Sequence, residues 1–387
     1  MEFRARPTAR GRADTRSDPP RARPSTPPTE PVRRRAEDPG HPADPGHPAD
    51  AGGRHPLTGD PGHPTEPPRR RAGGRIARRL RRTALAALVT AAVVVPVSAA
   101  ARPEIPAPAP AVLAPLTAST LDKAYEANRA DAAAAARMAA DHGDRTRAAA
   151  DRAMTAPSRR FLSFDGRGSG RAVEVFGDLA HADRVAVLVP GSDTTLETYD
   201  RFRAGAAALR ARLGRRGAVL AWLGYETPGT VSTTVLTTDR AKEAAPLLRA
   251  FLHRLRGVVG GSARVSLLCH SYGTVVCGSA APGLDVSDIV LVGSPGTGAS
   301  DAAALRTSAR VWAARGSADW IAHVPHASLG LFGTTVGFGP DPVSPAFGAR
   351  VFQAGTGGHS DYFAPGSVSL DNLARIVLGD PSEVTRA

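Results

Sequence analysis

One short stretch of the chain, Ala263–Gly278, constrains the fold more than any other. An apolar run over Val265–Leu268 ends abruptly at Cys269-His270-Ser271-Tyr272-Gly273, and apolar residues then resume with the spacing of a buried helix face. A strand, a sharp turn carrying a serine and a following helix are typical of a nucleophile elbow. The residues two before and two after such a serine must be small, because the turn is tight. Gly273 meets this demand, whereas Cys269, small but not glycine, is a departure from the pattern.

The first 82 residues lack what a folded domain needs. They contain one aromatic residue, Phe3, among dense Pro, Gly and Arg, and they imperfectly repeat the hexapeptide DPGHPA. Such a segment cannot bury enough apolar surface to offset its ordering entropy, so we predict a disordered tail over residues 1–82. The tail holds 19 Arg against 10 Asp or Glu, about +9 of the formal net charge of +13. Since no aromatic residues alternate with these arginines, we expect no specific nucleic-acid partner.

A basic cluster and an apolar run follow the tail. Arginines crowd residues 69–82, and the next segment, Thr83–Ala101, is uncharged and ends in small residues. This pattern is typical of a signal peptide, and the run is also long enough for a single transmembrane helix. We therefore expect an exported protein, either extracellular or anchored to the outer face of the cytoplasmic membrane. Cleavage of residues 83–101 stays open, and they bind the membrane only if uncleaved.

The chain has two cysteines, Cys269 and Cys277, on either side of the serine turn. Export would permit a disulfide, but the end of a strand and a position about two turns into a helix look too far apart for a bridge. We expect two buried free thiols. Neither the cysteines nor the 11 histidines have metal-ligand spacing, so we expect no metal and no cofactor.

The remaining sequence predicts one α/β domain. Residues 102–116 form a Pro/Ala linker, residues 117–157 favour an Ala-rich helix, and residues 158–387 alternate between apolar runs and helical patterns. This alternation indicates a mostly parallel central sheet flanked by helices. The expected strands are Ala172–Phe176, Val185–Val189, Ala218–Trp222, Arg264–Leu268, Asp288–Val292, Ala309–Ala313 and Arg350–Gln353. The expected helices are Leu196–Leu213, Asp239–Val259, Tyr272–Ala281, Ala299–Thr307 and Ser369–Leu378.

Ser271 needs an orienting acid, because a serine hydroxyl is a poor nucleophile by itself. The candidate is Asp319, which follows an apolar strand and the turn Gly316-Ser317. Two other aspartates are alternatives. Asp301 resembles a helix-start residue, and Asp288 opens a strand.

The candidate for the base is His359, which lies on a glycine-rich loop after the last expected strand. His270 adjoins the serine and should point away from it. His323 and His326 follow the acid too closely to act as its partner, although they could line the pocket.

An oxyanion hole requires two backbone N–H groups that point at one spot. We assign them to Tyr272, directly after the serine, and to Ser192, which follows the strand Val185–Val189. The segment Gly293–Gly298 lacks the ending of a phosphate-binding loop and is interpreted as lining the pocket. Residues 226–238, rich in Thr and Gly, are the candidate for a small lid.

Several of these segments, together with the Ala-rich helix, resemble an actinobacterial α/β-hydrolase family described as a domain of unknown function. The matching segments are Val189–Gly191, Ala221–Pro228, His270–Gly273, Val292–Gly296 and Gly358–Tyr362. The resemblance implies an α/β-hydrolase fold and a Ser-Asp-His triad, carried here by Ser271, Asp319 and His359. It implies no substrate. Cys269 stands where that family has glycine.

These observations predict an exported serine hydrolase that cleaves an ester-like acyl bond through an acyl-enzyme intermediate, acting on a small-molecule or lipid-like acyl substrate. Three alternatives stay open. The same triad would serve an acyltransferase, the scaffold would also suit a non-catalytic binding module, and the basic tail alone would be attracted to phosphate or anionic lipid.

Overall fold

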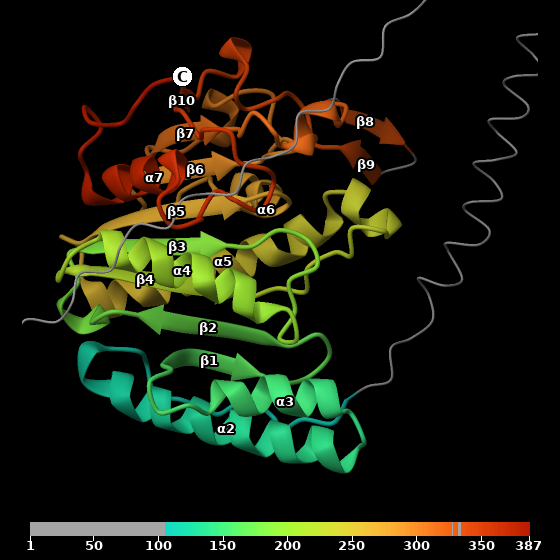
Figure 1. The fold of residues 1–387 in the computed structure, drawn as a ribbon, viewed down its shortest axis with the longest axis vertical. Coiled ribbons are helices and arrows are strands. Elements are labelled where there is room, and N and C mark those ends of the chain that lie inside the picture. The colour runs from blue at the N-terminus through green and yellow to red at the C-terminus, as the bar shows by residue number, and fades with distance from the viewer. Residues whose placement is uncertain (1–104, 327, 332–333) are drawn as a thin grey trace, which may run out of the picture. The chain divides into compact units, whose positions relative to one another are not determined.

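A computed structural model describes residues 105–326, 328–331 and 334–387. Its central feature is an eight-stranded sheet with the order β1-β2-β4-β3-β5-β6-β7-β10 (Figure 1). The six strands from β4 to β10 in this order run parallel, whereas β1 and β2 add an antiparallel edge. The strands are β1 (Phe161–Asp165), β2 (Arg171–Phe176), β3 (Arg184–Val189), β4 (Gly217–Leu223), β5 (Arg264–His270), β6 (Asp288–Val292), β7 (Arg310–Ala314) and β10 (Arg350–Val351).

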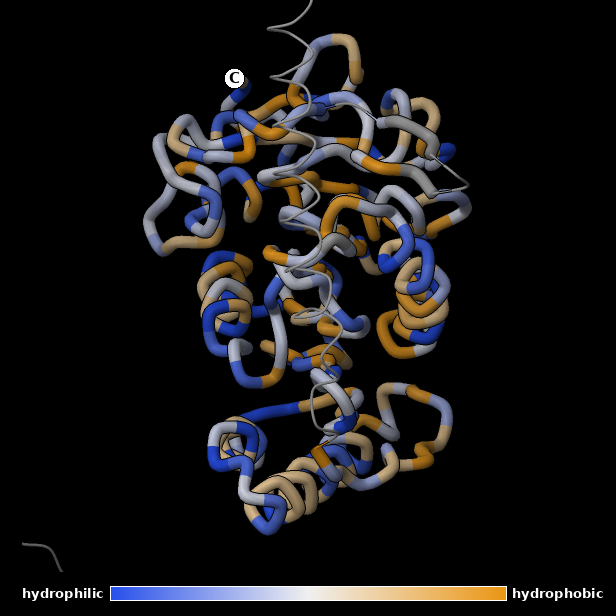
Figure 2. The backbone as a smooth tube through the Cα atoms, turned by 90° about the vertical axis from the view of Figure 1, so that its right-hand side faces the viewer, coloured by the Kyte–Doolittle hydropathy of each residue, from blue (hydrophilic) through white to orange (hydrophobic). Residues whose placement is uncertain are grey.

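Helices cover both faces of this sheet, as the alternating pattern predicted. Figure 2 looks onto the carboxyl ends of the parallel strands and shows hydrophobic strands running between helices on either side. Helices α4 (Tyr199–Arg212) and α7 (Val368–Leu378) pack together on one face, and α5 (Asp239–Val259) and α6 (Gly273–Ala280) pack together on the other. The sheet therefore has two buried sides, which explains why its strands are almost continuously apolar.

Strand β3 illustrates this two-sided burial. Val185, Val187 and Val189 join the apolar cluster under α5 and α6, while Ala186 and Leu188 join the cluster under α4 and α7. The side chains alternate because successive residues of a strand point to opposite faces. The fold thus holds the carboxyl end of β3 between two packed layers.

The Ala-rich segment predicted as one helix over residues 117–157 contains two helices, α2 (Leu121–Asp141) and α3 (Arg145–Met154). The break occurs because the Asp144 side chain accepts a hydrogen bond from the Arg147 backbone N–H and so begins a new helix. Helix α2 packs against α3 and β1.

The predicted helix Ala299–Thr307 is wrong. Only a short 3-10 turn, Ala303–Leu305, forms there. The backbone N–H groups of Gly298 and Ala302 donate instead to carbonyls of Phe338 and Phe347, which lie far along the chain. These tertiary hydrogen bonds replace the local ones that a helix would require.

Strand β1 and the hairpin of β8 (Ser328–Leu331) and β9 (Thr334–Gly337) were not predicted. Both hairpin strands are short and contain glycine and few large apolar residues, so they give a weak strand signal.

The predicted tail, residues 1–82, and the predicted signal peptide or membrane helix, residues 83–101, lie outside the described residues. Within the ranges that the structure describes, no helix combines the length and apolar character needed to cross a membrane.

Candidate active site

Ser271 occupies the sharp turn between β5 and α6, at the carboxyl edge of the parallel strands. Its φ of 54° lies in the left-handed region, which is costly for a residue with a side chain. The Ser271 N–H donates to the carbonyl of Val292 at the end of β6, and this bond holds the strained residue in place. A Cβ atom at Gly273 would lie 2.6 Å from the carbonyl oxygens of Val189 and Pro190, so only glycine fits there. The nucleophile elbow expected from the sequence is formed.

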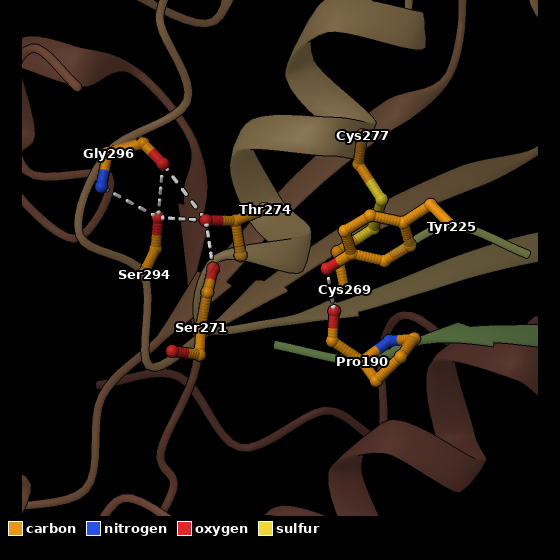
Figure 3. Close-up of a disulfide and its surroundings, with 8 residues drawn as sticks. All are labelled: Pro190, Tyr225, Cys269, Ser271, Thr274, Cys277, Ser294 and Gly296. Atoms are coloured by element: carbon orange, nitrogen blue, oxygen red, sulfur yellow. Dashed lines mark hydrogen bonds between the residues drawn. A yellow bond between two sulfur atoms is a disulfide. The ribbon is translucent and has the colours of Figure 1, made fainter. Parts of the chain in front are cut away.

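Cys269 and Cys277 are joined by a disulfide, which corrects the expectation of free thiols (Figure 3). Their Cα atoms are 6.5 Å apart, within the range that a disulfide spans. The prediction failed because the tight elbow folds α6 back beside β5 and brings its second turn close to the strand end. The bond therefore links the strand before Ser271 to the helix after it, and both cysteines are completely buried.

The three residues predicted as a triad come together from three separate loops. The Ser271 Oγ lies 2.8 Å from Nε2 of His359, and Nδ1 of His359 lies 2.8 Å from Oδ1 of Asp319. With its Nδ1 proton donated to the carboxylate, the imidazole presents an Nε2 lone pair to the serine hydroxyl. The arrangement has the geometry of a nucleophile, a base and an orienting acid.

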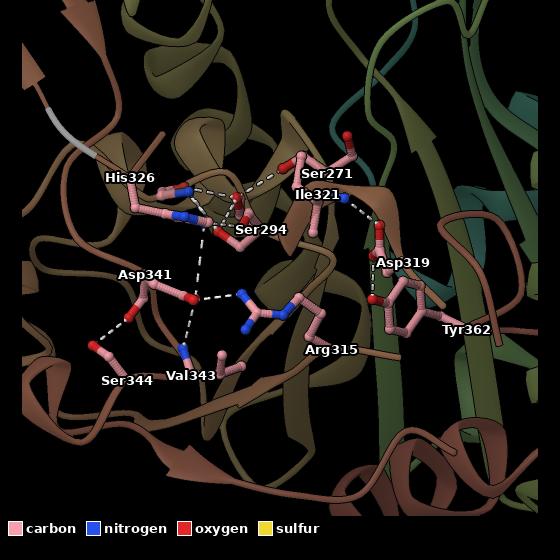
Figure 4. Close-up of polar contacts among 12 residues, drawn as sticks. Ser271, Ser294, Arg315, Asp319, Ile321, His326, Asp341, Val343, Ser344 and Tyr362 are labelled. Atoms are coloured by element: carbon pink, nitrogen blue, oxygen red, sulfur yellow. Dashed lines mark hydrogen bonds and ion pairs between the residues drawn. The ribbon is translucent and has the colours of Figure 1, made fainter. Parts of the chain in front are cut away.

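The carboxylate of Asp319 is buried and fully engaged (Figure 4). Besides the imidazole, Oδ1 accepts from the Ile321 N–H at 2.9 Å, and Oδ2 accepts from the Tyr362 hydroxyl at 2.5 Å. Burial raises the pKa of Asp319, but the hydrogen bonds from His359 and Tyr362 outweigh it and hold that pKa below its usual value. The acid is thus kept ionised beside the imidazole.

Tyr362 also belongs to the site. In the sequence it was noted as part of the motif Gly358–Tyr362, without a role of its own. Burial, followed by its hydrogen bond to the Asp319 carboxylate, raises the pKa of the hydroxyl, so it stays protonated and donates. The same oxygen accepts the Gly316 N–H at 3.1 Å. Tyr362 therefore ties the acid to the turn that precedes it.

His270 points toward the backbone of the base. Its Nε2 donates to the His359 carbonyl at 2.6 Å, and the two ring centroids are 4.8 Å apart. Burial, and then the nearby His359, lower the pKa of His270 to about 4. A neutral His270 thus holds the loop that carries the base without placing a second cation beside it.

The loop after β3 lies next to the nucleophile. A Cβ at Gly191 would be 2.6 Å from the Ser271 Cβ, so the glycine permits this close approach. Within the described part of the chain, the backbone N–H groups of Ser192 and Tyr272 donate to no protein acceptor. Both N–H groups are thus without a protein acceptor among the described residues, and their role as oxyanion donors stays a prediction.

Three hydrogen bonds hold the loop after β3. The buried Tyr225 hydroxyl donates to the Pro190 carbonyl at 2.8 Å (Figure 3). The Asp193 N–H donates to the Pro228 carbonyl, within the segment 226–238 that was interpreted as a lid. The buried Arg147 of α3 donates to Glu197 at 3.0 Å. No local pattern indicates the Arg147 contact.

The residues expected to line the pocket do not contact Ser271 in the way that His359 does. Ser294, in the segment expected to line the pocket, is buried and shares a hydrogen bond of 2.7 Å with Thr274 behind the elbow. His326 contacts the Ser294 carbonyl at 3.3 Å (Figure 4). His323 is exposed.

Neither alternative acid joins the serine. Asp301 accepts the Ala304 N–H at the start of the short 3-10 turn. Asp288 is buried at the opposite end of its strand, where it pairs with Arg264 and Arg310. Among the described residues, no group of three or more His, Cys, Asp or Glu is arranged to hold a metal ion.

The comparison with protein families agrees with this architecture. Residues 165–329 match the family model described as alpha/beta hydrolase, and the match contains the elbow and the acid. This segment is similar to the alpha/beta hydrolase family. The resemblance inferred from the sequence motifs and the predicted fold class are both confirmed.

The relatives found by sequence comparison are mycobacterial proteins. The chain is 29% identical over 247 residues to the uncharacterized protein Rv2079 of Mycobacterium tuberculosis, covering 55% of this chain and 37% of the relative. It is 36% identical over 143 residues to the uncharacterized protein Mb0988c of Mycobacterium bovis, covering 33% of this chain and 53% of the relative. The chain thus spans about half or less of the length of these relatives.

Solved structures that match include an α/β serine hydrolase without a lid from Xanthomonas campestris, with 17% identity and a TM-score of 0.37, covering 58% of this chain and 94% of that one. Another is carboxyl esterase 2 from Tuber melanosporum, with 12% identity and a TM-score of 0.35, covering 61% and 97%.

The disulfide leads to two expectations, one for the number of titratable thiols and one for the free energy of unfolding. Full-length protein purified from an oxidising compartment and denatured without reductant should contain no titratable thiol. The Cys269→Ala/Cys277→Ala variant should lose about 2–3 kcal/mol of unfolding free energy, as expected for a bond closing a short loop. Two titratable thiols in the parent, or equal denaturant midpoints for parent and variant, would contradict this assignment.

The lowered pKa of His270 should make the stability of the protein depend on pH. Its pKa is about 4 in the folded protein and about 6.5 when unfolded. Between these values the unfolded state binds more protons, so this histidine makes stability fall as the pH is lowered from about 6.5 to about 4. His270→Gln retains a side-chain N–H but does not titrate, and its denaturant midpoint should fall less than that of the parent over this range.

A matched control for this experiment is His142→Gln, which removes an exposed histidine. Its pH dependence should equal that of the parent. If His270→Gln behaves in the same way as this control, His270 is not the neutral group described above.

Proposed function

We propose that the protein is a serine hydrolase that cleaves an ester-like acyl bond with Ser271 as nucleophile, His359 as base and Asp319 as orienting acid. One observation carries the proposal. The serine, imidazole and carboxylate form a continuous chain of two hydrogen bonds, each 2.8 Å long, at the carboxyl edge of the sheet. Such a chain lets the imidazole take the proton of the serine hydroxyl and so activates the serine as a nucleophile.

In the first half of the reaction, the Ser271 Oγ attacks the carbonyl carbon while Nε2 of His359 takes the hydroxyl proton. The ionised Asp319 fixes the imidazole tautomer and stabilises the imidazolium. The negative oxygen of the tetrahedral intermediate accepts hydrogen bonds from the backbone N–H groups of Ser192 and Tyr272. The carbonyl carbon–oxygen bond to the alcohol then breaks, and His359 gives its proton to the departing alcohol.

In the second half, water replaces the alcohol. His359 takes a proton from the water as it attacks the acyl-enzyme, and then returns that proton to the Ser271 Oγ as the acid product departs. Each half-reaction uses the same base and the same two backbone donors. The substrate class that we propose is a small-molecule or lipid-like acyl ester.

We further propose that the hydrolase is exported and acts outside the cell or at the outer face of the cytoplasmic membrane. The basic cluster and apolar run over residues 69–101 support this location. The Cys269–Cys277 disulfide also supports it, because disulfides persist in oxidising compartments.

The test of the catalytic proposal uses a fluorophosphonate probe on the full-length chain. We expect the parent to be labelled, Ser271→Ala to lose all labelling, and His359→Ala to be labelled at least about 100-fold more slowly, since general-base catalysis contributes about that much or more. Asp319→Asn should also slow labelling, because it leaves the imidazole without its ionised partner. Asp301→Asn, which alters a partly exposed carboxylate away from the serine, is the control and should be labelled like the parent.

A folded parent that does not react would overturn the proposal and favour a binding module on the same scaffold. Where labelling succeeds, products formed with an added alcohol distinguish the two acyl chemistries. A dominant new ester would identify an acyltransferase, and a dominant free acid a hydrolase.

The location has its own test. The full-length chain carrying alkaline phosphatase at its carboxyl terminus should give active phosphatase in a bacterial host, because that reporter requires an oxidising compartment. Deletion of residues 83–101 should abolish the signal. Equal phosphatase activity with and without this segment would overturn the proposed route of export.

A further inference from the structure

Trp320 is a large apolar side chain in an unusual place. It follows the acid Asp319 directly and begins the 3-10 turn Trp320–His323, yet half of its surface (50%) is exposed. It is the one aromatic residue among the exposed large apolar side chains of the described chain. Single exposed apolar side chains are common on protein surfaces, so it is the place of this indole, directly after the acid, that makes it notable.

The indole lies against the base. The ring centroids of Trp320 and His359 are 4.6 Å apart, with their planes inclined by 47°. The same His359 ring contacts Ser271 through Nε2 at 2.8 Å. The exposed indole and the nucleophile therefore both contact one imidazole.

The chemistry of ester cleavage decides which part of a substrate meets this indole. The carbonyl oxygen must turn toward the N–H groups of Ser192 and Tyr272. The oxygen of the departing alcohol must instead approach Nε2 of His359, from which it receives its proton. A group attached to that oxygen would therefore lie close to the imidazole, against which Trp320 also packs.

We propose that Trp320 forms the binding surface for the alcohol portion of the ester, and that this portion carries a ring with a flat apolar face, either an aryl group or one face of a sugar. Rings of both kinds cover an indole better than a short alkyl group does, because they match its planar surface. This inference rests on the proposed esterase activity and adds the class of the leaving alcohol to it.

A different role for Trp320 gives a different kinetic result. If the indole only stabilised the imidazolium, it would assist both half-reactions, since His359 becomes protonated in each. A surface for the alcohol acts in acylation alone, because the alcohol has left before water attacks the acyl-enzyme. Separate measurement of the two steps therefore distinguishes these roles.

The experiment compares three butyrate esters on the full-length parent and on Trp320→Ala and Trp320→Phe. Benzyl butyrate and methyl 6-O-butyryl-glucopyranoside supply an aryl and a sugar ring, and ethyl butyrate supplies a short alkyl group. All three release a primary alcohol, so their leaving groups have similar reactivity. Decay of the butyryl-enzyme, followed by intact mass spectrometry, reports the second step.

For Trp320→Ala, we expect kcat/KM to fall roughly 3- to 10-fold for at least one ring ester, the loss typical of one aromatic contact. The value for ethyl butyrate should change less than about 2-fold. The butyryl-enzyme should decay at the parent rate, and Trp320→Phe should recover most of the lost activity. The ring ester that is affected identifies the aryl or the sugar class.

Leu247→Ala is the matched control, because Leu247 is also exposed (44%) but lies on α5. It should leave all three esters unchanged. An equal loss for all esters in Trp320→Ala, a slower decay of the butyryl-enzyme, or no change would each overturn the inference. A parent that hydrolyses none of the esters and does not react with the fluorophosphonate would overturn the proposed function as well.

Discussion

The whole site depends on holding one serine in a backbone conformation that it would not adopt by itself. Ser271 has a positive φ, and the turn around it leaves no space for a side chain at Gly273. The surrounding structure maintains this strain in two ways. The Ser271 N–H is bonded to β6, and the Cys269–Cys277 disulfide fastens the strand before the turn to the helix after it. The cysteine that departs from the usual glycine pattern thus becomes a covalent support for the elbow.

Asp319 is buried, and its carboxylate depends on hydrogen bonds in place of water. All of its close partners are donors, so the imidazole and the Tyr362 hydroxyl stabilise its negative charge. His270 contributes in a different way, since it is neutral and holds the backbone of the base. Two polar groups outside the triad therefore position its members without adding charge beside them.

The loop after β3 links the segment that matches the family to the helices that precede it. Residues 165–329 match the family, but Arg147 comes from α3, upstream of that match. Its guanidinium is buried, pairs with Asp151, and also reaches Glu197 in the loop after β3. A buried charge of this kind is costly unless all of its partners are in place. The leading helices are therefore structurally coupled to the loop that carries Ser192.

Local sequence patterns were enough to predict most strands of the central sheet and the candidate triad. They include the apolar strands, the elbow at Ser271, and the acid and histidine that follow later strands, because period, turn size and chain order are properties of neighbouring residues. Local patterns did not predict the Cys269–Cys277 bond, the loop in place of the helix Ala299–Thr307, or the contacts of Tyr362 and Trp320 with the candidate triad. Each of these depends on the distance between segments that are separated by a sharp turn or by many residues. That distance is set by packing of the whole sheet and its helices, which no local pattern records.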